Sequence, residues 1–269
     1  MEERSRKKLT AIFVSVAILV AFAVLVSCRV AELSNGGTAA NANARDLSQA
    51  EKLIVGSDTS YPPFEYLNQE GNADGFDIEV IGEIGNRLAK EIEIKSVSYD
   101  SLYQQLIEGD IDMAISALPV LEDKKTVVDY SQPYYTLEYL LLGLSDTEIK
   151  LKEDLDSQDV GMLKIARENL PPEVIARYRD AEYDDIKVML EDLKAKEIEG
   201  VIIAKPIAIN MLKQDIKIYR VLETIKSNRD FVIAIRKNSQ IKQDIDQIIA
   251  EMVEDGTMAE IYNNWFLLE

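Results

Sequence analysis

A loop that follows the first predicted strand constrains this chain most. The apolar pattern at residues 52–55 predicts a short strand, and Pro62 and Pro63 follow it closely. A proline has no backbone N–H to donate to a sheet and its ring fixes its own φ, so the chain leaves the strand here in a rigid loop. The amphipathic pattern at residues 77–88 then predicts a helix, which completes a strand–loop–helix unit.

This loop carries side chains that suit ligand binding. It holds the carboxylate of Asp58 and the aromatic rings of Tyr61 and Phe64. In open α/β sheets, ligands bind at the carboxyl ends of the strands, so the loop is a candidate binding segment. A proline-rich turn with aromatic core residues explains the same pattern, and the spacing alone does not decide between these interpretations.

Strand and helix patterns alternate along the rest of the chain, which predicts an α/β fold. An apolar run at residues 137–144 separates two such series, and no internal repeat is visible. We expect further strands at residues 92–97, 111–116, 159–162, 201–204, 216–221 and 231–236. We expect further helices at residues 101–107, 173–179, 186–196, 207–213, 241–253 and 258–266.

Residues 1–28 predict a targeting segment. A basic start precedes an almost wholly apolar run from Leu9 to Val26, and the only cysteine, Cys28, stands where a bacterial lipoprotein signal places its acylated residue. An uncleaved membrane anchor is the alternative. In either case the folded part lies outside the cytoplasmic membrane and stays tethered. Residues 29–50 are small and polar, which predicts a flexible linker.

Composition excludes several classes of function. The formal net charge of −18 argues against nucleic-acid partners. The chain has no histidine, which excludes Ser-His-Asp and Cys-His catalytic pairs and a zinc site of ordinary type. Neither GxxxxGK[ST] nor GxGxxG occurs. We therefore predict no metal, no cofactor and no catalytic residues.

Several short motifs occur in an informative order. They lie at residues 56–66, 75–80, 99–102, 108–116, 124–131, 133–135, 231–237 and 254–257. Each is weak alone, but together their order resembles that of the extracytoplasmic amino-acid-binding proteins of ABC transporters, solute-binding family 3. The resemblance covers residues 52–269.

The resemblance implies a two-lobed fold of the type II periplasmic-binding-protein class with two hinge strands. The first lobe would comprise residues 51–135 and 231–269, and the second residues 139–228, with hinge segments near 135–139 and 228–231. A ligand would lie between the lobes, and closure would bury it. The implied partners are a small-molecule ligand, an ABC permease and the membrane that holds the lipid anchor. The protein would be a monomer.

The resemblance also locates the family's ligand clamp. The arginine that holds the α-carboxylate falls at Lys124, and the residue that supports it falls at Pro119. The aspartate that receives the α-ammonium falls at Ala204, and the loop that donates amides falls at residues 165–167. The standard amino-acid clamp is therefore changed, because lysine lacks the two-donor fork of arginine and alanine offers no partner to an ammonium group.

We expect a rebuilt site. It would combine two groups of residues. The first is retained from the family and comprises Asp58, Tyr61, Tyr99 and Ser116, with the neighbouring Ala117. The second is cationic and comprises Lys124, Arg167 and Lys205, with Lys164 as a further candidate. The expected ligand is small, carries an anionic group and can present an apolar or aromatic body to the tyrosines.

Alternative roles stay open. The lysines suit solvated surface positions, Arg167 suits an ion pair with Glu168 or Asp185, and Asp58 suits a bond to the amides of its own loop. The main functional interpretation is a solute-binding lipoprotein that serves an ABC importer. The alternatives are a signalling or degenerate binding module and a dehydratase-type enzyme on the same scaffold.

Overall fold

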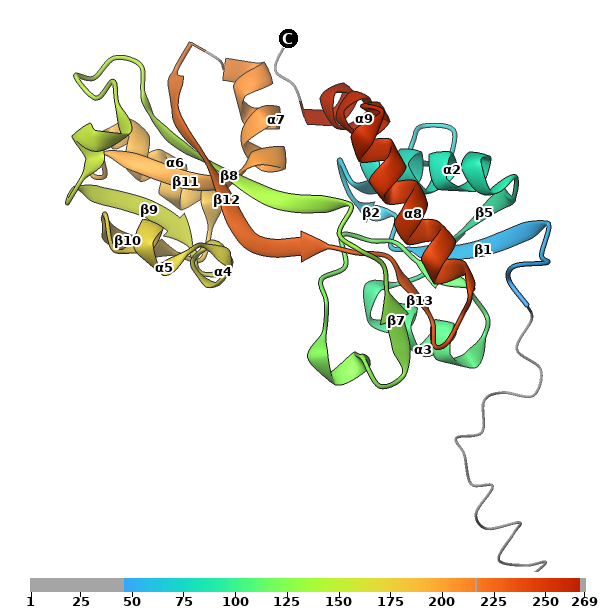
Figure 1. The fold of residues 1–269 in the computed structure, drawn as a ribbon. Coiled ribbons are helices and arrows are strands. Elements are labelled where there is room, and N and C mark those ends of the chain that lie inside the picture. Colours follow the sequence, from blue (N-terminus) through green and yellow to red (C-terminus); the bar gives the residue numbers. More distant parts are fainter. Residues whose placement is uncertain (1–45, 216, 267–269) are drawn as a thin grey trace, which may run out of the picture. The chain divides into compact units, whose positions relative to one another are not determined.

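The computed structural model describes residues 46–215 and 217–266, which form two five-stranded sheets and a small hairpin sheet (Figure 1). The first sheet has the order β5-β1-β6-β13-β7. Its strands are β1 (Lys52–Ser57), β5 (Glu91–Ser96), β6 (Met113–Ala114), β7 (Val128–Tyr130) and β13 (Ala234–Arg236). The small sheet joins β2 (Ser60–Tyr61), β3 (Glu65–Leu67) and β4 (Ala73–Asp74).

The second sheet has the order β10-β9-β11-β8-β12. Its strands are β8 (Tyr135–Leu144), β9 (Asp159–Leu163), β10 (Arg179–Tyr183), β11 (Gly200–Ala204) and β12 (Tyr219–Phe231). The predicted α/β class is confirmed, because parallel pairs dominate where helices connect the strands.

Helices cover both faces of each sheet (Figure 1). The first sheet carries α2 (Phe76–Leu88), η1 (Tyr99–Ser101), α3 (Leu102–Glu108), η2 (Glu122–Lys124), α8 (Ile241–Glu254) and α9 (Thr257–Phe266). The second carries η3 (Lys152–Leu155), α4 (Lys164–Asn169), α5 (Pro172–Ile175), α6 (Ile186–Ala195) and α7 (Lys205–Asp215). We call the first sheet with its helices and the small sheet the first lobe, and the second sheet with its helices the second lobe.

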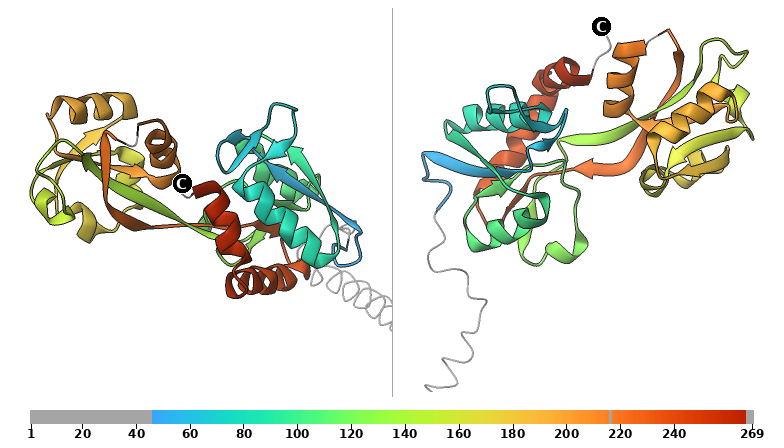
Figure 2. Two further views of the ribbon diagram at one scale, coloured as in Figure 1. Left: turned by 90° about the horizontal axis from the view of Figure 1, so that it is seen from above. Right: turned by 180° about the vertical axis from the view of Figure 1, so that it is seen from behind.

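Two long strands carry the chain between the lobes. β8 directly follows β7 of the first sheet, and β12 leads directly into β13. The two strands pair with each other in antiparallel register, and Tyr135 lies opposite Phe231 where they meet the first lobe. Figure 2 shows both strands passing between the lobes from two further directions.

An aromatic cluster surrounds this junction. The Phe64 ring lies 5.3 Å from Tyr135 and 5.4 Å from Phe231, measured between ring centroids. Phe76 of α2 and Phe266 of α9 complete the cluster. Such edge-on and tilted contacts stabilise a core beyond the area they bury, so the ends of both crossing strands are fixed in the first lobe.

The observed elements differ from the predicted ones in the second lobe. The predicted helix at residues 173–179 is wrong beyond Ile175, because the chain turns there into β10, which the sequence analysis did not predict. β10 is an edge strand with a polar sequence, Arg-Asp-Ala-Glu-Tyr, so it lacks an apolar strand pattern. The short helix α4 and the small sheet were also not predicted.

The packed part of the chain begins upstream of residue 51. Leu47 is only 3% exposed and belongs to the core. Cys28, the predicted signal and most of the predicted linker lie outside the described residues. Within the described part, no helix combines the length and the apolar character needed to cross a membrane.

Gly75 offers a test of the loop geometry. Its φ is 132°, and a Cβ there would lie 2.2 Å from the carbonyl oxygen of Phe64. We expect Gly75→Ala to lower the free energy of unfolding by about 2 kcal/mol or more. The positive φ is unfavourable for alanine, and the added Cβ would clash with the Phe64 carbonyl oxygen. Urea denaturation measures this change.

Gly82, inside the helix α2 that Gly75 precedes, provides the control. A Cβ at Gly82 would enter open space, so Gly82→Ala should stabilise the protein by about 0.4–1 kcal/mol. Equal effects of the two substitutions would contradict the proposed constraint at Gly75.

Candidate functional site

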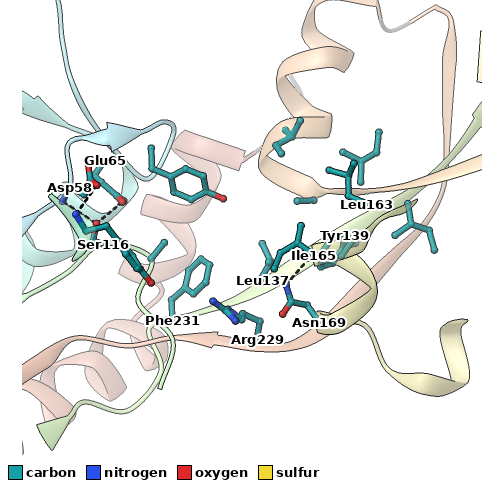
Figure 3. A pocket seen from close by; sticks show the side chains of 18 of the residues that line it. Asp58, Glu65, Ser116, Leu137, Tyr139, Leu163, Ile165, Asn169, Arg229 and Phe231 are labelled. Carbon is teal, nitrogen blue, oxygen red and sulfur yellow. Dashed lines mark hydrogen bonds between the residues drawn. The ribbon is translucent and has the colours of Figure 1, made fainter. Parts of the chain in front are cut away.

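A cavity of about 390 Å³ lies between the two lobes (Figure 3). The first lobe contributes Asp58, Tyr61, Glu65, Tyr99, Ser116 and Ala117 to its lining. The second lobe contributes mainly apolar side chains, among them Leu163, Ile165, Ile202, Ile203 and Ile207. The crossing strands add Leu137 and Tyr139 from β8, and Arg229 and Phe231 from β12. The volume lies in the range of small-molecule sites.

Asp58 is held in place by its surroundings in the first lobe. Its backbone N–H donates to Ser116 Oγ over 3.0 Å. Its carboxylate accepts hydrogen bonds from Ser60 Oγ at 2.6 Å and from the backbone N–H of Tyr99 at 2.9 Å. The loop after β1 is thereby tied to the segments that follow β5 and β6.

Two buried carboxyl groups lie beneath this loop. Glu65 is 1% exposed and Asp77 is 0% exposed. Ser116 Oγ donates to Glu65 Oε1 over 2.8 Å. Asp77 Oδ2 accepts from the backbone N–H of Ala117 at 2.7 Å and from the Tyr134 hydroxyl at 2.9 Å. Asp77 thus fixes Ala117 in a left-handed conformation with φ of 45°.

The remaining oxygens of the pair, Glu65 Oε2 and Asp77 Oδ1, are buried and have no hydrogen-bond donor among the described residues. Two ionised groups would leave both oxygens unsatisfied. Burial raises the pKa of Glu65, and the charge of Asp77 raises it further. Burial also raises the pKa of Asp77, while the bonds from Ala117 and Tyr134 oppose that rise. Because the two side chains lie within hydrogen-bonding reach, one proton shared between them satisfies both. The raised pKa of Glu65 favours a neutral side chain in this part of the cavity wall.

The structure places the sequence-predicted residues in two groups. Asp58, Tyr61, Tyr99, Ser116 and Ala117 line the cavity. Ala204, the position at which the resemblance places the family's aspartate, lines it as well.

The predicted cationic residues lie outside the cavity lining. Lys124 pairs with Asp123 at 3.4 Å, and Lys164 pairs with Asp184 at 2.8 Å. Arg167 forms an ion pair with Asp180 rather than with Glu168 or Asp185. Each of these side chains is thus paired with an acidic neighbour outside the lining.

Lys205 has a different role from the expected one. Its Nζ lies 2.7 Å from Glu138 Oε2 and also bonds the Tyr262 hydroxyl. The Tyr262 hydroxyl donates to the same Glu138 oxygen over 2.8 Å. These residues belong to α7, β8 and α9, so the cluster connects the second lobe to the last helix of the first.

Among the lining residues that the sequence analysis missed, Arg229 is the cation. It lies in the segment at residues 228–231 that we expect to act as a hinge. Its position in that segment was the available signal, since a hinge residue can face the cleft between two lobes. No group of histidine, cysteine, aspartate or glutamate side chains in the described residues is arranged to hold a metal ion.

The shared proton predicts a dependence of stability on pH. Because the folded-state pKa of Glu65 is raised, the native protein holds a proton that the unfolded chain releases, so stability falls as pH rises above the ordinary carboxyl range. Glu65→Gln keeps a neutral hydrogen-bonding group and should remove this loss. The stability of E65Q relative to the unsubstituted protein should grow by about 1–3 kcal/mol between pH 5 and pH 8. Urea denaturation across this range measures the difference.

Glu70→Gln is the control, because Glu70 is an exposed carboxylate of the neighbouring turn. Its stability profile should run parallel to that of the unsubstituted protein. A parallel profile for E65Q would show that Glu65 holds no extra proton in the native state.

A family model described as "Bacterial extracellular solute-binding proteins, family 3" matches residues 53–268. The arginine-binding extracellular protein ArtP of Bacillus subtilis is 26% identical over 231 residues, which cover 84% of this chain and 90% of that protein. The L-cystine-binding protein TcyJ of Escherichia coli is 26% identical over 218 residues, 80% of this chain and 82% of that protein.

A solved structure has the same fold. The second substrate-binding domain of a putative amino acid ABC transporter from Streptococcus pneumoniae superposes with a TM-score of 0.69 at 22% identity. The match covers 80% of this chain and 100% of that domain.

Proposed function

Because the chain belongs to the bacterial extracellular solute-binding proteins of family 3, we propose that it captures a small amino-acid-like or carboxylate ligand between its lobes for an ABC importer. The two-lobed type II fold expected from the sequence is confirmed. The relatives are binding proteins, and this chain is a binding protein rather than an enzyme.

The cavity between the lobes is the observation that carries this proposal. Both lobes and both crossing strands contribute to its wall, so a change in the angle between the lobes would open or enclose it. We take residues 51–135 with 231–269 and residues 139–228 as the moving bodies. The proposed ligand contacts in the first lobe are Asp58, Tyr61, Tyr99, Ser116 and Ala117.

The anchoring of this ligand is proposed to be non-standard. Ala204 at the cavity wall cannot accept a hydrogen bond from an ammonium group through its side chain. Lys124, at the position of the family's carboxylate-binding arginine, lies outside the lining. The names of the relatives nevertheless favour ligands of amino-acid size.

Ligand binding predicts a thermal shift. A ligand that binds only the native state at 100 times its Kd stabilises the protein by about 2.7 kcal/mol. A screen of amino acids, dicarboxylates, aromatic acids and small amines by thermal unfolding should therefore find a stabilising compound. Small-angle scattering should then show a smaller radius of gyration with that compound, because the lobes close. A chain that gains no stability and does not contract with any of them would contradict the proposed function.

We also propose that the mature protein is a monomer outside the cytoplasmic membrane, anchored through lipid on Cys28. Cys28→Ala should abolish incorporation of radiolabelled palmitate and move the protein from the membrane fraction to the soluble fraction. The double variant Cys28→Ser, Ser34→Cys keeps one thiol nearby and should behave like Cys28→Ala. Retention of either variant in the membrane fraction would favour an uncleaved anchor.

A further inference from the structure

Arg229 has no partner for its side chain among the described residues. Only its backbone is engaged, through an N–H bond to Ser227 Oγ at 3.0 Å. Every other arginine in the described part of the chain makes a salt bridge or a side-chain hydrogen bond: Arg87, Arg167, Arg177, Arg179, Arg220 and Arg236. A guanidinium group carries five N–H donors, and those of Arg229 form no hydrogen bond with the described residues.

The charge of Arg229 acts on the cavity. Burial is the largest cause of the raised pKa of Tyr61, Tyr99 and Tyr139, and the positive charge of Arg229 opposes the rise at all three. These tyrosines come from three elements that line the cavity, β2, η1 and β8. In Figure 3 Arg229 lies between Phe231 and Asn169. The guanidinium group is therefore positioned to meet a ligand.

The carboxyl groups of the lining do not neutralise Arg229. Both oxygens of Asp58 accept hydrogen bonds within the first lobe, from Ser60 and Tyr99. Glu65 accepts a hydrogen bond from Ser116, and its raised pKa favours a neutral group. Neither carboxyl group forms a salt bridge with Arg229 in the described structure. The guanidinium group can therefore form charge-assisted hydrogen bonds with an anionic group of a ligand.

The second lobe offers a hydrocarbon surface. Apart from the crossing strands β8 and β12, its part of the lining contains no charged side chain among the described residues. Its polar group, the Asn169 amide, donates to the Tyr139 hydroxyl of β8 over 3.2 Å. Apolar side chains form the remainder, among them Leu163, Ile165 and Ile203. An ammonium group placed against this wall would have no carboxylate to bind.

Building on the proposed function, we propose that Arg229 binds the carboxylate of a small organic acid whose apolar body lies against the second lobe. The anionic anchor of the site then lies on the crossing strand β12 rather than at Lys124. An α-amino group is not required for binding, because the second-lobe wall offers no carboxylate to pair with it.

Matched ligand series test this assignment on the full chain by isothermal titration calorimetry. One series is 4-methylpentanoate, its primary amide and leucine, which adds an α-amino group to the same skeleton. The other is 3-phenylpropanoate, its amide and phenylalanine. The acids should bind, and each amide should bind about 10- to 100-fold more weakly, because it cannot form charge-assisted bonds with Arg229. Leucine and phenylalanine should bind no more tightly than the corresponding acids.

Substitutions identify the residue responsible. Arg229→Gln should weaken binding of each acid about 10- to 100-fold and leave the amides unchanged. Arg229→Lys should cause a smaller loss, since lysine keeps the charge but not the fork. Lys226→Gln removes the same charge from an exposed position of the same strand and should change affinity less than about twofold. Thermal unfolding of each variant checks that the fold is kept.

Several results would overturn the inference. They are equal binding of acid and amide, undiminished binding of the acids by R229Q, tighter binding of leucine or phenylalanine than of the acids, and failure of both acids to bind. If a compound from the thermal screen closes the lobes equally well in R229Q, the ligand assignment is wrong but the receptor function stands. If no compound closes the lobes, both proposals fail.

Discussion

The pair of buried carboxyl groups, Glu65 and Asp77, organises the first lobe around the cavity. Asp77, in the first turn of α2, holds the backbone of Ala117 in a left-handed conformation that a non-glycine residue rarely adopts. Glu65 holds Ser116, which in turn receives the N–H of Asp58. The Tyr134 hydroxyl also bonds Asp77, and Tyr134 is the residue directly before β8. One shared proton thus supports the ligand-facing loops and the start of a crossing strand, because two ionised carboxylates at this depth would repel each other.

The aromatic cluster beside this pair explains how one lobe can move while the site keeps its shape. Tyr135 and Phe231 stack at a centroid distance of 5.5 Å where β8 and β12 leave the first lobe. Phe64, in the same loop as Glu65, packs against both rings. The strand ends therefore belong to the rigid first lobe, and bending has to occur farther along. The irregular pairing between Lys226 and Asp230 is such a place, since a disrupted ladder bends more easily than a regular one.

Most of the fold was predictable because its signals are local. Apolar periodicity gave α2, α8 and α9 nearly to the residue, and the two prolines located the loop that carries Asp58 and Tyr61. The errors at Arg167 and Lys164 share one origin. β10 has no apolar pattern because it is an edge strand, and it supplies Asp180, the partner of Arg167, and Glu182, a partner of Lys164. A motif alignment places a cation along the chain but does not show which acid lies across the sheet. The motif alignment therefore assigned Arg167 to the cleft, and its partner Asp180 was not among the acids that the sequence analysis considered.

The location of Arg229 determines how such a site would select its ligand. An anion bound to a crossing strand lies near the axis of closure, so its charge alone does little to draw the lobes together. Closure must then be driven by the apolar body of the ligand. Its burial between both walls stabilises the closed state by about 25 cal/mol per Å² of apolar surface. A carboxylate too short to reach Ile165 or Ile203 from Arg229 would bind without closing the lobes. Selection for ligand length would therefore act on the closed state, in which both lobes enclose the ligand. Selection for charge would act on the initial binding step.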